Sequence, residues 1–244
     1  MSEIRITVIN PNTTESMTEL IAESAQAAAA PGTVINGRTP SMGPASIESH
    51  YDEALSVPGV LQVIAQDPAA DAFVLACFGD PGLDAARELA TVPVLGIAEA
   101  AMKAATLLGR SFSVVTTVGR TVGRAWDLTR IYGLERQCAG IHACEIPVLA
   151  LEQDPEHSYR TILASAAQAL ESDGSDVIVL GCAGMADLPS RLATKLGVPV
   201  IDGVAAATVL AEGLVRLGIR PSDHDELAPP PPKTYTGLLH DFGI

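Results

Sequence analysis

The chain has 244 residues, enough for one large domain or two of about 120 residues each, and in either case enough to bury a core. Hydrophobic residues make up 48% of the sequence but aromatic residues only 4%, so Ala, Val and Leu must fill the interior, which favours tightly packed α/β layers over a β-sandwich. A net charge of −14 argues against nucleic acid or an anionic membrane as a partner, because both require clustered Lys and Arg.

Short apolar, β-branched segments alternate along the chain with Ala-rich segments of helical character. The first half contains predicted strands at residues 4–10, 33–39, 72–77 and 92–97. The second half contains predicted strands at residues 111–117, 144–151, 176–182 and 198–202. Predicted helices run to about Ala30, through Leu108 and from about Arg120 to Tyr132. This alternation predicts mainly parallel sheets that are flanked by helices on both faces.

The two halves of the chain repeat each other at a nearly constant spacing. The matched pairs, 105 or 106 residues apart, are Asp71 with Asp176, Cys77 with Cys182, Pro93 with Pro199, and residues 8–11 with 114–117. This register predicts two similar α/β lobes, related by a pseudo-two-fold duplication, with the active site between them. We expect the lobes at 1–100 and 101–203. A helix at about 204–218 would pack back on the first lobe, and 219–244 would form a proline-rich tail.

The cysteines and the absence of targeting signals indicate a reducing compartment. The sequence shows no signal peptide and no run of 18 apolar residues, so we expect a cytoplasmic protein that does not act at a membrane. In the cytosol the cysteines are expected to be thiols rather than disulfides. Cys138, His142 and Cys144 form the one candidate zinc cluster, but the usual structural spacings are missing, and we expect no metal.

Polar residues follow several of the predicted strands. They are Asn10 and Asn12 after the first strand, Cys77 after the third, Thr116 and Thr117 at the end of the fifth, and Cys182 after the seventh. In open parallel sheets, ligands bind beyond the carboxyl ends of the strands. Two lobes that face each other across a cleft would therefore bring these residues together.

The matched cysteines predict two-base chemistry. One thiolate and one thiol on opposite sides of a stereocentre can remove a proton from one face and return a proton to the other. Each cysteine precedes a glycine-containing turn into a predicted helix, with starts at 80–81 and 187–189, and free backbone N–H groups there would favour a thiolate. The lysines lie away from strand ends and no nucleotide-binding motif is present, so we expect no cofactor. The competing interpretations are buried packing cysteines and a Cys77–Cys182 redox pair.

The whole chain resembles the aspartate/glutamate/hydantoin racemase superfamily, specifically its hydantoin and allantoin racemase branch. The segments that carry the resemblance are VINPNTT (8–14), GPASIESHYDEAL (43–55), ACFGDPGLDAA (76–86), GIAEAA (96–101), SVVTT (113–117) and LGCAGM (180–185). The resemblance implies two similar α/β lobes, a homo-oligomer, and cofactor-independent inversion at a carbon next to a carbonyl. It also implies that Cys77 and Cys182 are catalytic, with Cys77 taking the proton from the D isomer and Cys182 from the L isomer.

The residues beside the cysteines suggest a neutral ring as substrate. Cys-Phe-Gly and Cys-Ala-Gly replace the Thr or Asn that amino-acid racemases of the superfamily place there, so we expect a racemase of 5-monosubstituted hydantoins. The expected substrate-binding residues are Asn12, Ser46, Phe78, Gly79, Thr116, Thr117, Ala183 and Gly184. Phe78 and the segment 42–46 would form the wall near the C5 substituent. The backbone amides around Gly79 and Gly184, with Asn12 and Thr116 or Thr117, would hold the ring oxygens and nitrogens.

Other functions remain open at this point. Allantoin racemase is the nearest alternative. An aspartate/glutamate-type amino-acid racemase, a maleate isomerase-like enzyme and a non-catalytic two-lobed small-molecule binding protein are further alternatives. Arylmalonate decarboxylases keep only the second cysteine, so Cys77 argues against that activity.

Overall fold

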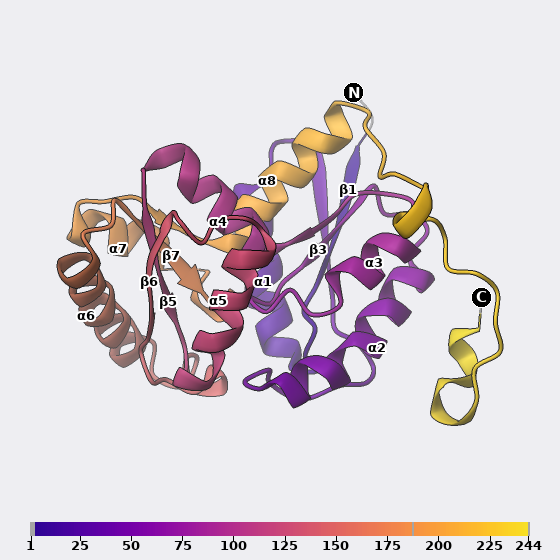
Figure 1. Cartoon of the computed structure of the whole chain (residues 1–244), viewed down its shortest axis with the longest axis horizontal. Coiled ribbons are helices and arrows are strands. Elements are labelled where there is room, and N and C mark those ends of the chain that lie inside the picture. Colours follow the sequence, from indigo (N-terminus) through magenta and orange to yellow (C-terminus); the bar gives the residue numbers. More distant parts are fainter. Residues whose placement is uncertain (1–2, 187, 244) are drawn as a thin grey trace.

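The fold is a duplicated α/β architecture (Figure 1). In a computed structural model that describes residues 3–186 and 188–243, the strands form two four-stranded sheets. The strands are β1 (Ile4–Ile9), β2 (Thr33–Arg38), β3 (Ala72–Leu75), β4 (Val94–Gly96), β5 (Phe112–Thr116), β6 (Cys138–Ala143), β7 (Val177–Gly181) and β8 (Val200–Ile201). The orders are β2-β1-β3-β4 and β6-β5-β7-β8, and all neighbouring strands are parallel. The predicted fold class is thus confirmed.

Helices cover both faces of each sheet. They are α1 (Glu15–Ala28), α2 (His50–Gln66), α3 (Leu83–Leu89), α4 (Ile97–Leu108), α5 (Val122–Ile131), α6 (Pro155–Asp173), α7 (Pro189–Leu196) and α8 (Gly203–Arg216). On the first sheet, α1 and α8 cover one face, and α2 and α3 cover the other. On the second sheet, α4 and α5 cover one face, and α6 and α7 cover the other. Burial on both faces explains why the strands read as continuous apolar runs.

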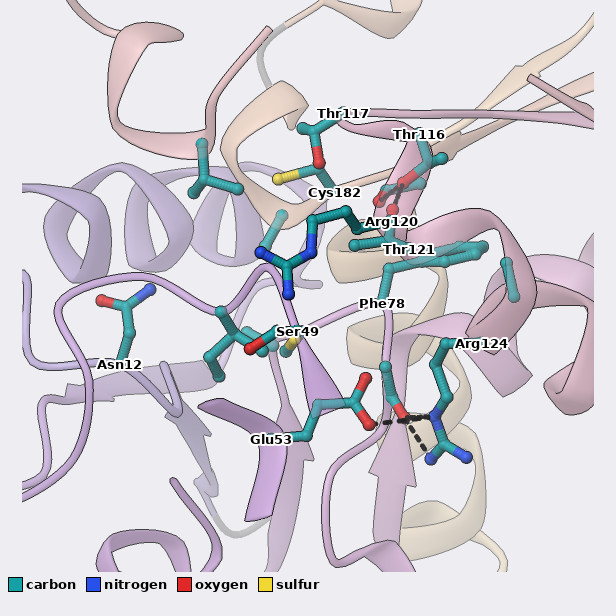
Figure 2. Close-up of a pocket in the computed structure, with 18 of the residues that line it drawn as sticks. Asn12, Ser49, Glu53, Phe78, Thr116, Thr117, Arg120, Thr121, Arg124 and Cys182 are labelled. Carbon is teal, nitrogen blue, oxygen red and sulfur yellow. Dashed lines mark hydrogen bonds and ion pairs between the residues drawn. The ribbon is translucent and has the colours of Figure 1, made fainter. Parts of the chain in front are cut away.

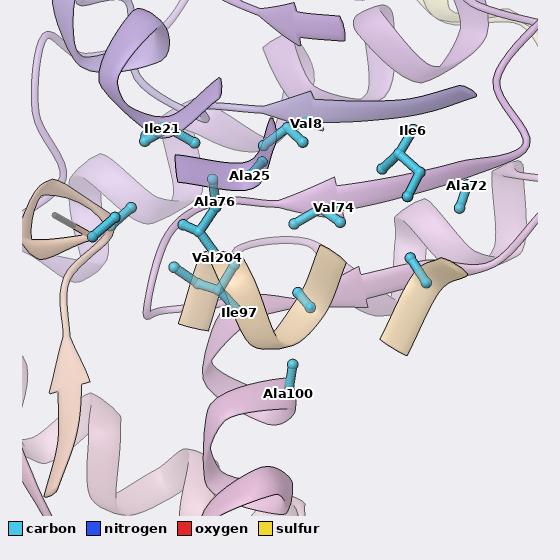
Figure 3. Close-up of a cluster of buried hydrophobic side chains, with 14 of the residues drawn as sticks. Ile6, Val8, Ile21, Ala25, Ala72, Val74, Ala76, Ile97, Ala100 and Val204 are labelled. Atoms are coloured by element: carbon cyan, nitrogen blue, oxygen red, sulfur yellow. The ribbon is translucent and has the colours of Figure 1, made fainter. Parts of the chain in front are cut away.

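The core beneath α8 joins distant parts of the sequence (Figure 3). Val204 of α8 packs in one buried cluster with Ile6 and Val8 of β1 and Val74 of β3. Helix α8 also contacts α1 and α4. The chain therefore returns from the end of the second sheet to complete the layer over the first.

One strand lies earlier than expected. We predicted residues 144–151, but β6 is Cys138–Ala143, and the predicted segment contains the one-turn 3₁₀ helix η2 (Val148–Ala150). Pro147 supplies no N–H for a strand ladder, and Glu145 has a φ of 56°, which is outside the extended region. The apolar residues of this segment instead pack in a loop over the second sheet, where Ile146 and Leu151 are buried.

The turn into α3 differs from the expected helix start, whereas α7 begins within the expected one. Helix α3 begins at Leu83, after Gly82, whose φ of 71° is in the left-handed region that favours glycine. Helix α7 begins at Pro189. Of the expected start at 187–189, Asp187 lies outside the described residues.

The C-terminal tail runs beside the body of the protein rather than within it. Figure 1 shows it in yellow, leaving the end of α8 and passing along the side that carries α2 and α3. In the part of the chain that the structure describes, no helix is both long and apolar enough to cross a membrane.

Candidate active site

The loops that carry Cys77 and Cys182 meet between the two sheets. Cys77 follows β3 and Cys182 follows β7, and both are partly exposed. Their neighbours Ala76 and Ala183 belong to the same buried apolar cluster. Both cysteines line one pocket, which measures about 690 Å³ with its open mouth included. Two cysteines that are 105 residues apart in the sequence thus line the same pocket.

Burial raises the pKa of both thiols. It raises the pKa of Cys77 far above the usual range, and the charges of Glu53 and Cys182 act in the same direction. It raises the pKa of Cys182 to about 12. The backbone N–H groups of Gly79 and Gly184 face the respective thiols and oppose these shifts. We expected the turns to favour a thiolate. The N–H groups are present, but desolvation outweighs them, so both groups rest as thiols at neutral pH.

Most of the residues expected at the site lie on the pocket wall. The wall includes Asn12, Cys77, Phe78, Gly79, Thr116, Thr117, Cys182 and Ala183. Ser46 is not on this wall, and the neighbouring Ile47 and Ser49 are there instead. Gly184 is not on it either, although its backbone N–H faces the Cys182 thiol. A Cβ on Gly184 would also lie 3.0 Å from Leu151, so the turn is closely packed.

Asn12 presents an oriented amide to the pocket. Its Oδ1 accepts hydrogen bonds from the Asn10 side chain at 2.9 Å and from the Thr14 N–H at 2.9 Å. These bonds fix which end of the amide is the donor. The Nδ2 atom contacts only the Met17 sulfur, at 3.1 Å, which is a weak acceptor. Asn12 is therefore ready to donate to a stronger acceptor, such as a carbonyl oxygen of a bound ring.

The two threonines at the end of β5 differ in their hydrogen bonds. The Thr116 hydroxyl contacts the Thr121 hydroxyl at 2.9 Å and donates to the Gly181 carbonyl at 3.2 Å, so it ties β5 to β7. The Thr117 side chain makes no such bond within the described residues, and Figure 2 shows it beside Cys182. Of the two, Thr117 has the hydroxyl available to a ligand.

Charged residues that we did not predict complete the mouth of the pocket. Ser49, His50 and Glu53 come from the start of α2, and Arg120 and Arg124 come from the segment around the start of α5 (Figure 2). The signal for this helix start was present in the sequence, because Ser49 is three residues before an acidic residue, Asp52, as in a capping box.

Arg124 connects the two lobes at the pocket. It donates two hydrogen bonds to the Gly79 carbonyl, from Nε at 3.1 Å and from Nη2 at 2.7 Å. It also forms an ion pair with Glu53, with Nε 3.3 Å from Oε2. Burial raises the pKa of Glu53, while Arg124 acts against this shift. The arginine thus holds the Cys77 loop and the start of α2 from the opposite lobe.

Asp80 fixes the other side of the Cys77 loop. Its carboxylate accepts hydrogen bonds from the N–H groups of Ala98 (3.1 Å) and Glu99 (2.9 Å), at the start of α4, and from the Tyr132 hydroxyl (2.6 Å). Burial raises the pKa of Asp80 to about 6, against the effect of these bonds. A Cβ at Gly96 would lie 2.3 Å from this carboxyl group, so the loop is seated directly against the helix start.

The candidate zinc cluster does not assemble. Cys138 contacts the Gly140 carbonyl, Cys144 contacts the Thr117 carbonyl, and His142 pairs with Asp173 at 2.7 Å. Among residues 3–186 and 188–243, no three His, Cys, Asp or Glu side chains converge as metal ligands would.

Comparisons with known proteins agree with this architecture. The family model for Asp/Glu/hydantoin racemases matches residues 6–211. Hydantoin racemases from Rhizobium meliloti and Pseudomonas sp. (strain NS671) are 47% and 45% identical to this chain, over 96% and 98% of it and over 98% and 97% of their own lengths. The structure of an allantoin racemase from Klebsiella pneumoniae is 48% identical, covers 99% of each chain and has a TM-score of 0.96. The chain belongs to the Asp/Glu/hydantoin racemase family and is an isomerase of the racemase type.

Proposed function

We propose that this protein is a cofactor-independent racemase of 5-monosubstituted hydantoins, with Cys77 and Cys182 as its two acid–base groups. The observation that carries the proposal is that two thiols, from equivalent positions of a duplicated fold, line one pocket. The racemase family and the relatives named hydantoin racemase support the reaction class.

The proposed reaction moves one proton out and one proton in. The thiolate form of one cysteine removes the C5 proton, and the C5–H electron pair moves into the ring to give an enolate at the C4 oxygen. The thiol of the other cysteine then donates its proton to the opposite face of C5, and the C4 carbonyl re-forms. The two sulfurs have exchanged protonation states, so the next turnover runs in the reverse sense or follows proton exchange with water. By family resemblance, Cys77 acts on the D isomer and Cys182 on the L isomer.

The groups around the thiols suit such a ring. The Asn12 amide can donate to one ring carbonyl, and the Thr117 hydroxyl is available to a ring oxygen or nitrogen. The backbone N–H groups of Gly79 and Gly184 face the thiols, so they stabilise whichever sulfur is charged. Because burial makes each thiolate costly, a thiolate in this pocket is also a strong base toward carbon.

Allantoin racemisation is the second candidate. Allantoin is itself a hydantoin with a ureido group at C5, so the same step at the same carbon would serve both substrates. The similarity to a solved structure named allantoin racemase, at 48% identity, favours this candidate as strongly as the curated relatives favour the first.

Polarimetry on L-benzylhydantoin and (S)-allantoin, side by side, tests the proposal. Decay of the hydantoin signal alone selects the first candidate, decay of allantoin alone selects the second, and decay of neither refutes both. Dialysis against EDTA should leave the rate unchanged. A loss of activity that zinc restores would refute the metal-free mechanism.

We also infer that the enzyme is cytoplasmic and a homo-oligomer. The described cysteines are free thiols, as expected of a reducing compartment, and the oligomer follows from family resemblance. Sedimentation at micromolar concentration tests the assembly, and a monomer would contradict it.

A further inference from the structure

Arg120 occupies the mouth of the pocket without an obvious task. It lies in the one-turn 3₁₀ helix η1 (Gly119–Thr121), between β5 and α5. Figure 2 shows its guanidinium directed into the pocket, between Cys182 and Ser49 in this view. The side chain is exposed and also lines the pocket, so a bound ligand can meet it at the mouth.

The hydrogen-bond donors of the Arg120 guanidinium have no acceptor among the described residues. No hydrogen bond or ion pair joins it to another residue in the described part of the chain, whereas Arg124 beside it is engaged by Gly79 and Glu53. Hydrogen bonds from Ser49 lower the pKa of Asp52, and the Arg120 charge adds to this effect only as a lesser cause. Five N–H donors in a rigid fork therefore face the pocket without an acceptor.

The charge at the mouth is not balanced by the other groups there. Among the residues that the structure describes, Glu53 is the pocket-lining carboxylate, and Arg124 already neutralises it at 3.3 Å. His50 lies 3.9 Å from the same carboxylate, is largely exposed and can only add positive charge. The Arg120 guanidinium is thus the excess charge of the site, and it favours a ligand that brings a negative or strongly accepting oxygen.

The part of the ligand that meets Arg120 follows from the proposed function, on which this inference rests. If the thiols flank C5, the C5 substituent begins beside them and must leave through the space around the mouth. In Figure 2, Asn12 lies on one side of the pocket and Phe78 on the other, and Arg120 extends between them. A substituent that leaves the thiols through the mouth would therefore pass the exposed Arg120 side chain.

We propose that Arg120 is a specificity-determining residue that selects hydantoins whose C5 substituent ends in an oxygen acceptor. Such an acceptor is a carboxylate or the carbonyl of a ureido group. A guanidinium binds either with two parallel hydrogen bonds, which an apolar substituent does not offer. The site therefore favours polar C5 substituents over the benzyl and isobutyl groups of ordinary apolar hydantoins.

The test compares three substrates and four proteins. The substrates are allantoin, 5-(2-carboxyethyl)hydantoin and 5-isobutylhydantoin, and the proteins are wild type, Arg120→Met, Arg120→Lys and the control Arg136→Met. Arg136 is exposed and outside the pocket. We expect Arg120→Met to lower kcat/KM about 10- to 100-fold for the two substrates with an acceptor, and less than about 2-fold for the isobutyl substrate. Arg120→Lys should restore kcat/KM for the carboxylate substrate more than for allantoin. An ammonium group supplies the charge that a carboxylate needs, but it lacks the two parallel N–H donors that bind a ureido carbonyl.

The remaining outcomes each decide the proposal. An equal loss of kcat for all three substrates would mean that Arg120 acts on the ring or its enolate. No loss for any substrate would mean that Arg120 does not contribute to binding or catalysis. Either result overturns the proposal. If wild type racemises none of the compounds, the proposed function fails separately. Calorimetric binding of the same compounds then decides on Arg120, since selectivity that survives Arg120→Met would refute its role.

Discussion

The two lobes share their scaffold down to individual hydrogen bonds. In the first, the Thr7 hydroxyl donates to Asp67 at 2.7 Å, and in the second, the Ser113 hydroxyl donates to Asp173 at 2.6 Å. Both members of the pair are displaced by 106 positions (113 − 7 and 173 − 67). Each bond ties a central strand to the end of the second helix after it, α2 in the first lobe and α6 in the second. Duplication has thus preserved the frame that carries the two cysteines.

The lobes differ where they face the pocket. The first contributes the carboxylate Glu53, and the second contributes the cations Arg120 and Arg124. Besides burial, the charges of Glu53 and Asp80 raise the pKa of Cys77, and those of Glu48 and Asp202 raise the pKa of Cys182. Of these four described carboxylates, Glu53 alone lines the pocket. A symmetric scaffold therefore holds two thiols in unlike electrostatic surroundings, and the two directions of racemisation need not depend on pH or on the neighbours in the same way.

Replacing either thiol should have the largest effect. Cys77→Ser and Cys182→Ser should each lower the racemisation rate by about 10²- to 10⁴-fold, because a hydroxyl is too weak an acid to complete the proton relay. In deuterium oxide the remaining thiol can still exchange the C5 proton of one enantiomer with retention. We expect Cys182→Ser to exchange the D isomer and Cys77→Ser the L isomer, as measured by NMR or mass spectrometry.

The handedness of this exchange decides whether the thiols oppose each other. The spontaneous exchange at C5, measured without enzyme, is subtracted from each rate. If both variants exchange the same enantiomer, or either racemises at the wild-type rate, the two lobes do not provide opposed bases.

The raised pKa values predict an activity that increases with pH. Below its pKa a thiol is protonated and is no base, so its thiolate fraction rises tenfold per pH unit until the pKa is reached. With a pKa of about 12 for Cys182 and a higher one for Cys77, kcat/KM should rise about 100-fold between pH 6 and 8. Initial rates, corrected for the uncatalysed reaction and for ionisation of the substrate, measure this.

Folding stability limits the pH range of that experiment. Because the thiol pKa values are higher in the folded than in the unfolded chain, their contribution to stability is complete below the unfolded value of about 8.5 and is lost as the pH rises above it. Rates are therefore compared below this pH. A plateau of kcat/KM already at pH 6 would show that a thiolate exists in the free enzyme and that burial does not dominate.

Breaking the contact between the lobes at Arg124 should have an intermediate effect. Arg124→Met removes two hydrogen bonds to Gly79 and leaves the largely buried Glu53 carboxylate without its cation, so we expect kcat/KM to fall about 10- to 100-fold. Arg130→Met is the matched control, because Arg130 lies on the same helix but pairs only with exposed partners. It should change the rate less than about 2-fold.

A double-mutant cycle sharpens this comparison. If the pair acts across the pocket, Glu53→Gln together with Arg124→Met should cost clearly less than the sum of the single changes in free energy of activation. Additive effects would mean that the two residues act independently and that the ion pair does not link the lobes in catalysis.

The fold was largely predictable because its signals are local. Alternating apolar strands and helices, repeated at a constant spacing, indicated two parallel sheets before any contact was known. The exception is β6, where Cys-Ala-Gly-Ile-His-Ala contains a single β-branched residue and looks less like a strand than the segment that follows it. Its place in the sheet is set by pairing with β5, a long-range interaction that residue preferences do not encode.

The site was predictable only where the repeat marked it. Cys77 and Cys182 stand at matched positions, so their meeting in one pocket followed from the duplication. Glu53 and Arg124 have no such mark, since they lie on helices of different lobes and meet only when the lobes pack. The sequence repeat therefore does not reveal the residues in which the two lobes differ.

The smallest predicted effect tests the shared frame itself. Thr7→Val and Ser113→Ala each remove a buried hydroxyl that donates to an aspartate, and we expect each to lower the free energy of unfolding by about 1–2 kcal/mol. When the hydroxyl is lost, Asp173 keeps His142 at 2.7 Å, whereas Asp67 keeps, among the described residues, only the longer contact with the Asn36 amide at 3.4 Å, so Ser113→Ala should cost no more than Thr7→Val. Urea denaturation at pH 7 measures both. If one change is neutral while the other costs 2 kcal/mol or more, the two bonds are equivalent in position but not in energy, and the symmetry of the lobes is one of geometry alone.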